Sequence, residues 1–224
     1  MGEWIRIDLH LHTRGSWDCL TDPEAVLDRA ASQGIGRIAI TDHNRLGVAR
    51  QMARRYPDRV IAGEEVKTRE GVDVIGLYLT EEIPKGTPAR ETCRRIRAQG
   101  GIVYLPHPFA PGKGGSGRLA SALAPMVDVV EVFNARLRSE RRNALALELA
   151  RSRGLLQGAG SDAHSVAEVG NASVRVPAHP NAPPALLEAL RRATIHGRRA
   201  GPHVFLHSNW AKLRKRWPPG RGGA

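Results

Sequence analysis

Histidine and carboxylate side chains at a two-residue spacing are the residues of this chain best suited to chemistry. His10 and His12 lie two residues apart in an apolar run, and Asp162 and His164 repeat the spacing. Alternate side chains of a β-strand point to the same face, so each pair can contact one cation. Imidazole and carboxylate together favour divalent metals such as Zn, Mn or Fe. The spacing therefore predicts a metal site built from two separate segments.

Further histidines and carboxylates enlarge the candidate set beyond one ion. The candidate metal ligands are His10, His12, Asp18, His43, Glu65, His107, Asp162 and His164. Five histidines and three carboxylates exceed the coordination capacity of a single ion, so we expect two or three divalent ions. A lone histidine at a strand end is more often a hydrogen-bonded structural residue than a metal ligand. The prediction of a metal site therefore rests on the occurrence of several such histidines and carboxylates in one chain.

β-type runs alternate with helical patterns, which predicts parallel βαβ units. The β-type runs cover residues 5–11, 38–41, 60–66, 72–79, 102–105, 127–133, 157–160 and 173–176. The main helical patterns cover residues 22–33, 45–56, 88–98, 139–153 and 184–195, and residues 69–71 form a predicted hairpin turn. Each cluster of candidate ligands follows the end of a β-type run. A parallel barrel collects strand ends at one face, whereas a doubly wound sheet spreads them along an edge, so we expect an α/β barrel.

Length and composition limit the class of protein. A chain of 224 residues suits one large domain, or one domain with a small appendage. An apolar fraction of 41% excludes intrinsic disorder for most of it. No apolar run approaches the roughly 20 residues of a membrane span. The first residues lack a secretion signal, so we expect a cytoplasmic protein.

The charge balance is strongly basic. The 34 basic residues exceed the 22 acidic ones, for a formal net charge of +12. Such an excess is typical of proteins that bind polyanions, including nucleic acid, phosphorylated metabolites and anionic membranes. A coding bias toward arginine explains the same excess without any such partner. Composition alone leaves both explanations open.

The ordered motifs of the chain closely resemble those of the polymerase and histidinol phosphatase (PHP) family. The matching segments are Asp8-Leu9-His10-Leu11-His12-Thr13, Ser16-Trp17-Asp18, Thr41-Asp42-His43-Asn44, Gly63-Glu64-Glu65-Val66, Pro106-His107-Pro108 and Gly160-Ser161-Asp162-Ala163-His164. They occur in family order over residues 5–200. The resemblance implies a distorted (β/α)7 barrel with a metal cluster at the C-terminal ends of the strands, and hydrolysis of phosphoesters by a metal-activated water.

The resemblance also implies a distribution of the ligands among the metals. His10, His12, Glu65 and Asp162 would hold one ion, and Glu65 would bridge to a second ion that His107 also binds. The third ion would be held by Asp18, His43 and His164. The residues expected at the reaction centre are Glu65, Asp162 and His164.

Two acidic residues near Glu65 need separate treatment. Glu64 is expected to point away from the site. Many relatives have a histidine where this chain has Asp73, three residues before Gly76. The second metal site is therefore expected either to be weak or to use Asp73 as an oxygen ligand, which favours a harder ion such as Mn.

Cations that follow the strand ends are candidates for binding the substrate phosphate. The set comprises Arg136, Arg45, Lys113, Arg14 and Arg138. We prefer Arg136, because a guanidinium group matches phosphate oxygens in a bidentate fashion. The alternative for each is a solvated loop residue.

The chain divides into a barrel domain and a tail. We expect the PHP-like barrel over residues 1–201, with residues from about 160 to 201 as a short PHP-associated segment. Residues 202–224 form a basic amphipathic tail whose end is expected to be disordered. Its apolar residues recur at helical spacing: Leu206, Trp210, Leu213 and Trp217. We expect this stripe to dock on the chain's own domain, with a nucleic acid or a membrane surface as the alternative.

The predicted function is metal-dependent hydrolysis of a phosphomonoester or of a nucleotide or oligonucleotide phosphate. The expected partner is accordingly a phosphorylated small molecule or a nucleotide. One alternative is a non-catalytic metal-binding PHP module that serves a nucleic-acid partner. Another, within the enzymes, is a histidinol-phosphate phosphatase. The sequence does not distinguish an imidazole-containing substrate from a nucleotide.

Overall fold

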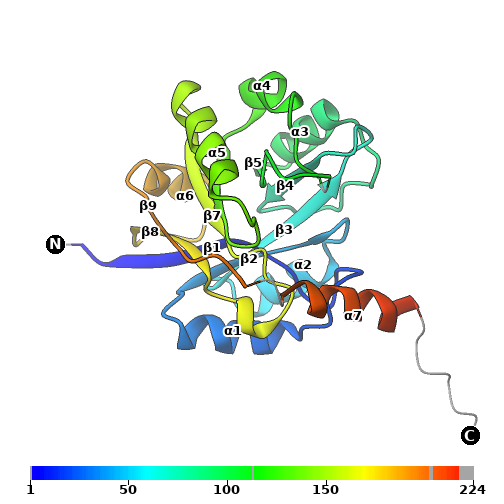
Figure 1. Ribbon diagram of the computed structural model, residues 1–224. Coiled ribbons are helices and arrows are strands. Elements are labelled where there is room, and N and C mark those ends of the chain that lie inside the picture. The colour runs from blue at the N-terminus through cyan, green and yellow to red at the C-terminus, as the bar shows by residue number, and fades with distance from the viewer. Residues whose placement is uncertain (1, 113, 202–203, 217–224) are drawn as a thin grey trace, which may run out of the picture.

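One mixed β-sheet, curved around on itself, forms the body of the molecule (Figure 1). The computed structural model describes residues 2–112, 114–201 and 204–216. The strands are β1 (Trp4–Leu11), β2 (Arg37–His43), β3 (Val60–Lys67), β4 (Asp73–Leu77), β5 (Ile102–Leu105), β6 (Val129–Asn134), β7 (Leu156–Gly160), β8 (Ala172–Pro177) and β9 (Thr194–Gly197). Their order across the sheet is β7-β6-β5-β4-β3-β2-β1-β8-β9.

Helices connect most of the strands and cover the outside of the sheet (Figure 1). They are α1 (Pro23–Ser32), α2 (Gly47–Arg55), α3 (Ala89–Ala98), α4 (Leu119–Leu123), α5 (Glu140–Ser152), α6 (Pro183–Leu190) and α7 (Val204–Arg216), with 3-10 turns η1 (Ala124–Met126) and η2 (Val166–Glu168). Among the described residues, none of the helices is long and apolar enough to cross a membrane.

Hydrogen bonds between β1 and the segment after β7 bring the two ends of the curved sheet together. The Asp162 amide donates to the His10 carbonyl at 2.8 Å, and the His12 amide donates to the Ala163 carbonyl at 2.9 Å. Strands β1 to β7 therefore enclose a nearly closed barrel, while β8 and β9 extend the sheet beyond β1. The predicted barrel is confirmed, and the doubly wound alternative is wrong.

The direction of some strands differs from the expected parallel arrangement. Strand β4 is antiparallel to both β3 and β5, and β8 is antiparallel to β1. The predicted hairpin turn at residues 69–71 explains the first case, because a short turn reverses the chain without a crossover helix. The helix expected over 184–195 ends at Leu190, because Thr194–Gly197 pairs with β8 as β9.

Alternating side chains divide the buried residues between an inner and an outer core. In β2, Ala39 joins the inner cluster, while Ile38 and Ile40 pack in the outer cluster together with helix residues. Strand β1 departs from strict alternation, since Leu9 lies in the inner cluster and Leu11 in the outer one. Its register against β2 shifts between Asp8 and Leu11. With this irregularity, His10 in β1 and His12 directly after it both face the inside of the barrel.

We expect Gly160→Ala to destabilise the barrel at its closure. A Cβ atom at Gly160 would lie 2.3 Å from the His10 Cβ and 2.6 Å from Glu131 Oε1, so the strands would have to separate. The free energy of unfolding, measured by chemical denaturation, should fall by about 1–3 kcal/mol. Gly47→Ala is the matched control, because no atom lies within 4 Å of a Cβ placed there. Equal stability of the two variants would contradict this account of the closure.

Candidate metal centre

All eight predicted metal ligands converge at one end of the barrel. Three overlapping groups have ligand atoms within 4.8 Å of one another: His10, His12 and Asp162; His10, Glu65 and His107; and His12, His43 and His164. Asp18 completes the cluster from the loop after β1, since its carboxylate lies 3.4 Å from His164 Nε2 and 3.7 Å from His43 Nε2. The structure thus brings together every ligand candidate that the sequence indicated.

Glu65 occupies the middle of the cluster. Its Oε2 atom lies 2.9 Å from His43 Nδ1, 3.4 Å from His12 Nε2 and 3.5 Å from His10 Nε2. Its Oε1 atom lies 3.0 Å from His107 Nε2. Asp162 contributes a second carboxylate, with Oδ1 3.3 Å from His12 Nε2. Both carboxylates can therefore be shared between neighbouring cations.

Electrostatic interactions ionise the carboxylates of the cluster and divide its histidines, because the pKa of His12 is lowered while the pKa values of His10, His43 and His107 are raised. Burial and the neighbouring His164 and His43 lower the pKa of His12 to about 3, so its imidazole is neutral. Burial opposes ionisation of Glu65, but His43 and His10 hold its pKa well below the usual range. Burial also opposes ionisation of Asp162, but His10 and His12 hold the pKa of its carboxyl well below the usual range. Burial opposes protonation of His43 and His107, but Glu65 raises the pKa of each to about 9, so a divalent cation that binds here would displace their protons.

Glu131, which the sequence analysis did not assign a role, orients His10. Its Oε1 atom lies 3.0 Å from His10 Nδ1, and its carboxylate also accepts hydrogen bonds from the His107 amide and the Asn134 side chain. A proton on Nδ1 shared with Glu131 leaves His10 Nε2 free to bind a metal. A charged residue within the apolar run 127–133 was the available signal in the sequence.

Ser16 and Asp42 orient His12 in a comparable way. The Ser16 hydroxyl donates to Asp42 Oδ1 at 2.8 Å and accepts from the His43 amide at 3.0 Å. Its oxygen lies 3.0 Å from His12 Nδ1. The Asp42 carboxylate also accepts from the Thr13 amide and hydroxyl. Because the Ser16 proton is committed to Asp42, His12 carries its proton on Nδ1 and presents Nε2 to the cluster.

Two ligands come from residues with an unusual backbone. His107 has φ of 27° and Asp162 has φ of 52°, a region that residues other than glycine seldom adopt. Each stands two residues beyond the end of a strand, β5 or β7. The Asp162 conformation is held by its hydrogen bond to the His10 carbonyl. Backbone strain of this kind is typical of functional sites, where the surrounding structure enforces it.

The unmatched polar atoms of the cluster fit bound cations. Within the described part of the chain, Asp18 Oδ1 is buried and makes no hydrogen bond, and Glu65 Oε2 is surrounded by imidazole nitrogens alone. Burying charged oxygens without a partner is unfavourable. Since the donor set is imidazole and carboxylate and no thiolate takes part, it suits borderline or hard divalent metals.

The two acidic residues near Glu65 take different places. Glu64 points away from the cluster, as expected: it accepts a hydrogen bond from the Ile83 amide at 2.9 Å, and burial raises its pKa to about 7. Asp73 pairs with Lys67, with Nζ 2.8 Å from Oδ1. It belongs to none of the three ligand groups found among the described residues.

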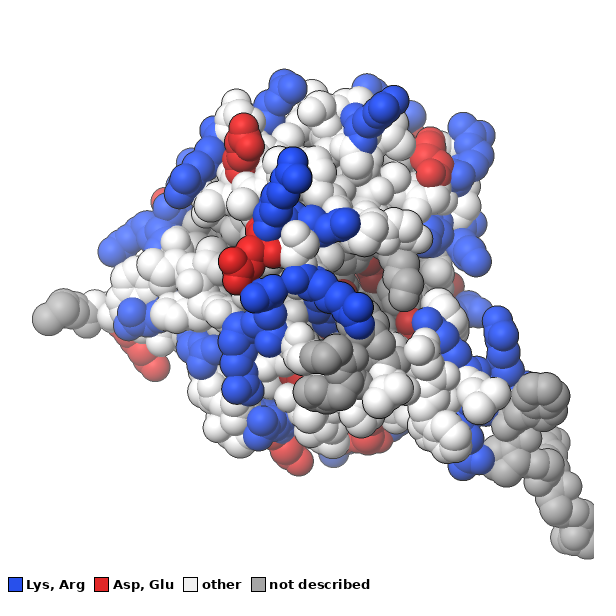
Figure 2. All heavy atoms as spheres, viewed as in Figure 1, with Lys and Arg blue, Asp and Glu red and all other residues white. Residues whose placement is uncertain are grey.

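The cluster opens into a cavity of about 670 Å³. Asp18, His43, Glu65, His107, Asp162 and His164 all line it. The basic residues of its wall are Lys67, Lys85, Arg136, Arg138, Arg142 and Lys212. Over the face shown in Figure 2, basic side chains clearly outnumber acidic ones. The cavity therefore combines several cations in its wall with the carboxylates of the cluster.

Only some of the predicted phosphate-binding residues line the cavity. Arg136 and Arg138 line the cavity. Arg45 and Arg14 are not among its lining residues: Arg45 is paired with Glu82 and Arg14 with Asp22. Lys113 lies outside the described residues.

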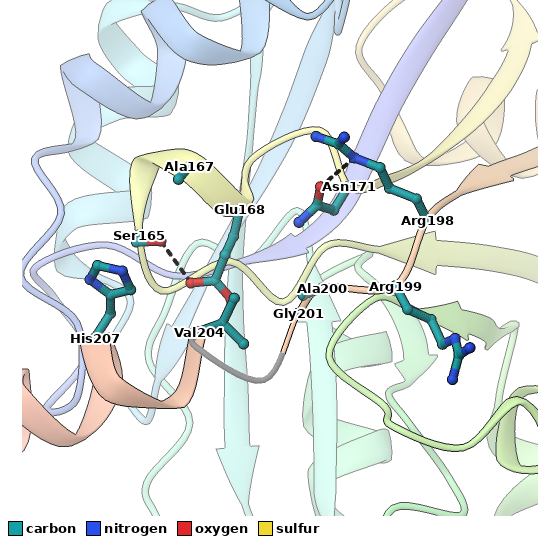
Figure 3. Close-up of a pocket in the computed structure, with 10 residues that line it drawn as sticks. All are labelled: Ser165, Ala167, Glu168, Asn171, Arg198, Arg199, Ala200, Gly201, Val204 and His207. Carbon is teal, nitrogen blue, oxygen red and sulfur yellow. Dashed lines mark hydrogen bonds between the residues drawn. The ribbon is translucent and has the colours of Figure 1, made fainter.

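Arg136 contacts protein groups through all three guanidinium nitrogens. Nε lies 3.4 Å from Glu168 Oε2, Nη1 contacts His164 Nδ1, and Nη2 donates to Ser208 Oγ at 3.1 Å. Glu168 also accepts a hydrogen bond from Ser165 at the wall of a second cavity of about 220 Å³ (Figure 3). This second cavity is lined by none of the eight predicted ligands.

Helix α7 docks through a different face from the one expected. Among the side chains of α7 that the structure describes, Val204, Ser208 and Ala211 are buried. The predicted apolar stripe points to solvent, since Leu206, Trp210 and Leu213 are 69%, 58% and 51% exposed. The expected docking of this stripe on the domain is therefore wrong. Val204, Ser208 and Ala211 face the domain instead, and Lys215 donates to the carbonyls of Arg14 and Ser16 in the loop after β1. Trp217 and the tail end beyond it lie outside the described residues.

Two known proteins are similar to this chain in sequence. An uncharacterized protein of Methanocaldococcus jannaschii, MJ0417, is 38% identical over 176 residues, which is 76% of this chain and 70% of that protein. A 5'-3' exoribonuclease of Haemophilus influenzae is 29% identical over 98 residues, covering 41% of this chain and 35% of the relative.

A solved structure supports the fold over nearly the whole length. It is a two-domain protein of Bacteroides vulgatus containing a predicted PHP-like metal-dependent phosphoesterase, with a TM-score of 0.70 and 19% identity. The alignment covers 94% of this chain and 70% of that one. The family model for the PHP domain matches residues 8–100, and the model for the PHP-associated segment matches residues 140–195. With its ligand cluster at the end of a nearly closed barrel, the chain belongs to the PHP family.

Proposed function

We propose that this protein is a metal-dependent phosphoesterase that hydrolyses a phosphomonoester, including the terminal phosphate of a nucleotide or short oligonucleotide. The observation that carries the proposal is the convergence of three overlapping His and carboxylate groups on a cavity whose wall is basic. Such an arrangement combines metal binding with attraction of an anionic substrate at one place.

The ligands are proposed to act in three sets. His10, His12, Glu65 and Asp162 hold one ion, and Glu65 and His107 hold a second. Asp18, His43 and His164 hold the third. When bound, clustered divalent ions lower the pKa of a water molecule and neutralise the charge that develops on phosphoryl oxygens. The roles of Glu65, Asp162 and His164 at the reaction centre are part of this proposal, as is the choice among Mn, Zn and Fe.

The remaining cavity residues are proposed to position the substrate. Arg136 and Arg138 present guanidinium groups on the wall, and Arg136 holds the ring of His164. A guanidinium next to a ligand imidazole places positive charge where a phosphoryl oxygen would lie. The name of the Haemophilus influenzae relative, an exoribonuclease, supports nucleotide phosphates as substrates. A non-catalytic module would have no evident need for this many converging metal-binding side chains.

Removing the metal or one central ligand should abolish turnover. We expect hydrolysis of p-nitrophenyl phosphate to stop on chelation and to return with Mn²⁺ or Zn²⁺. Asp162→Ala should lower both metal content, measured by elemental analysis, and kcat/KM, by more than the roughly 10–100-fold typical of residues that only support ligands. Asp28→Ala, on the exposed face of α1, is the control for loss of a carboxylate. Full metal content in the Asp162 variant would overturn the ligand assignment.

Loss of the hydrogen-bond partner of His10 should weaken metal binding without removing a ligand. We expect Glu131→Gln to reduce affinity for Mn²⁺ about 10–100-fold, because the carboxylate no longer fixes and polarises the His10 ring. Calorimetric titration of the metal-free protein measures this. Tyr104→Phe is the matched control, since it removes only the hydroxyl that donates to Glu131 at 3.2 Å. If both variants bind Mn²⁺ as the wild type does, Glu131 does not orient His10.

A further inference from the structure

We propose that Trp17 determines substrate specificity by stacking its indole ring on the base of a nucleotide whose phosphate lies at the metal ligands. This inference rests on the proposed function and narrows its substrates to phosphoesters that carry a planar heterocycle. Ser16, directly before Trp17, contacts His12 through its hydroxyl. Asp18, directly after it, lies 3.4 Å from His164 Nε2. The backbone on both sides of Trp17 is therefore held by the metal centre itself.

Three aromatic rings lead from the buried ligands to the mouth of the cavity. The rings of His12 and His43 are stacked with centroids 4.3 Å apart, and the Trp17 ring lies 6.2 Å from that of His43 at an angle of 35°. Exposure rises in the same order: the His12 side chain is buried, that of His43 is 21% exposed and Trp17 is 53% exposed. Trp17 is thus the outermost of the three rings, directly outside the ligands.

The cavity has room for more of a substrate than its phosphate. Trp17 lines the same cavity of about 670 Å³ into which the ligands open. This volume falls in the range of roughly 300–1,000 Å³ that is typical of pockets enclosing a whole organic molecule. Pro111 and Leu137 also line the cavity, so part of its wall is apolar. A planar group that covers the exposed indole removes apolar surface from water and adds a favourable ring–ring contact.

A contact with helix α7 holds the indole in a defined orientation. Lys212 Nζ lies 4.9 Å from the centroid of the Trp17 ring, which is a cation–π contact. The helix is itself anchored on the loop that carries Trp17, since Lys215 donates to the carbonyls of Arg14 and Ser16. A ring that is ordered before binding loses little conformational freedom when a ligand stacks on it, which favours binding.

The position of Trp17 favours a base that a sugar separates from the phosphate. A ring bonded directly to a phosphate oxygen would lie at the ligands, whereas Trp17 lies one ring further out, beyond His43. In a nucleotide, the sugar spans this interval. Stacking on an aromatic side chain suits any of the bases, because each has a π face. The basic wall of the cavity suits the phosphate of the same molecule.

The test compares hydrolysis of adenosine 5'-monophosphate (AMP) with that of ribose 5-phosphate, which is the same sugar phosphate without the base. Phosphate release by the Mn²⁺-loaded full chain measures both. We expect Trp17→Ala to lower kcat/KM for AMP about 5–100-fold, chiefly through KM, which is the effect of losing one base stacked on an aromatic side chain. The kcat/KM for ribose 5-phosphate and the metal content should stay within twofold of wild type.

Two further variants serve as controls. Trp17→Phe keeps an aromatic ring at the same place and should retain most of the kcat/KM for AMP. Trp210→Ala removes an indole that is 58% exposed and is not among the residues that line the cavity. It should leave the kinetic constants for both substrates unchanged.

The pattern of losses in Trp17→Ala separates stacking on a base from support of the metal centre. An equal loss for AMP and ribose 5-phosphate would assign Trp17 to support of the ligands and overturn the inference. Unchanged constants for AMP would overturn it as well. Phenyl phosphate, whose ring is bonded directly to the phosphate oxygen, is the third substrate, and a loss for this compound alone would contradict a nucleobase.

A wild-type protein that hydrolyses none of the three compounds would contradict the proposed function instead. Quenching of tryptophan fluorescence by AMP then tests the stacking directly. Quenching that is present in the wild type and lost in Trp17→Phe supports the inference, because that variant keeps the ring but lacks the indole fluorophore. Equal quenching in both proteins, or none in either, overturns it.

Discussion

The hydrogen bonds that join β1 to the segment after β7 are the interaction on which the site depends. They bring His10 and His12, from the first strand, against Asp162 and His164, about 150 residues later in the chain. Without this closure, the candidate group of His10, His12 and Asp162 would be split between two separate segments. Closure also buries most of these side chains, so that each ionised carboxylate needs a cation or a hydrogen bond.

Such a concentration of buried charge demands support from outside the ligand set. Glu131 and the Ser16–Asp42 pair determine which nitrogen of His10 and His12 faces the cluster. His107 and Asp162 are held in a sparsely populated backbone conformation by their surroundings. These features make the centre rigid before any ion binds, which reduces the cost of ordering the ligands on binding.

The surroundings of the centre separate into ligand-holding and substrate-facing parts. Arg136 belongs to both, because it lines the cavity and links Glu168, His164 and α7. Lys212 and Trp17 belong to the outer part, at the mouth. Part of the basic excess behind the net charge of +12 is concentrated at the cavity, since six basic residues line its wall.

The convergence of the candidate ligands, the barrel and the family resemblance could be predicted from the sequence, because polar residues follow the ends of the β-type runs and the motifs occur in family order. The two-residue spacing was a weaker guide, since β1 departs from strict alternation and Asp162 and His164 lie beyond the end of β7. What only the tertiary structure decided involves contacts between distant segments. The antiparallel β4, the pairing of Asp73 with Lys67, the support of His10 by Glu131 and the docked face of α7 each depend on which surfaces meet. The apolar spacing of α7 predicted the wrong face, because Arg136 and the loop after β1 present polar groups and backbone carbonyls, and these select Ser208 and Lys215 over Leu206 and Trp210.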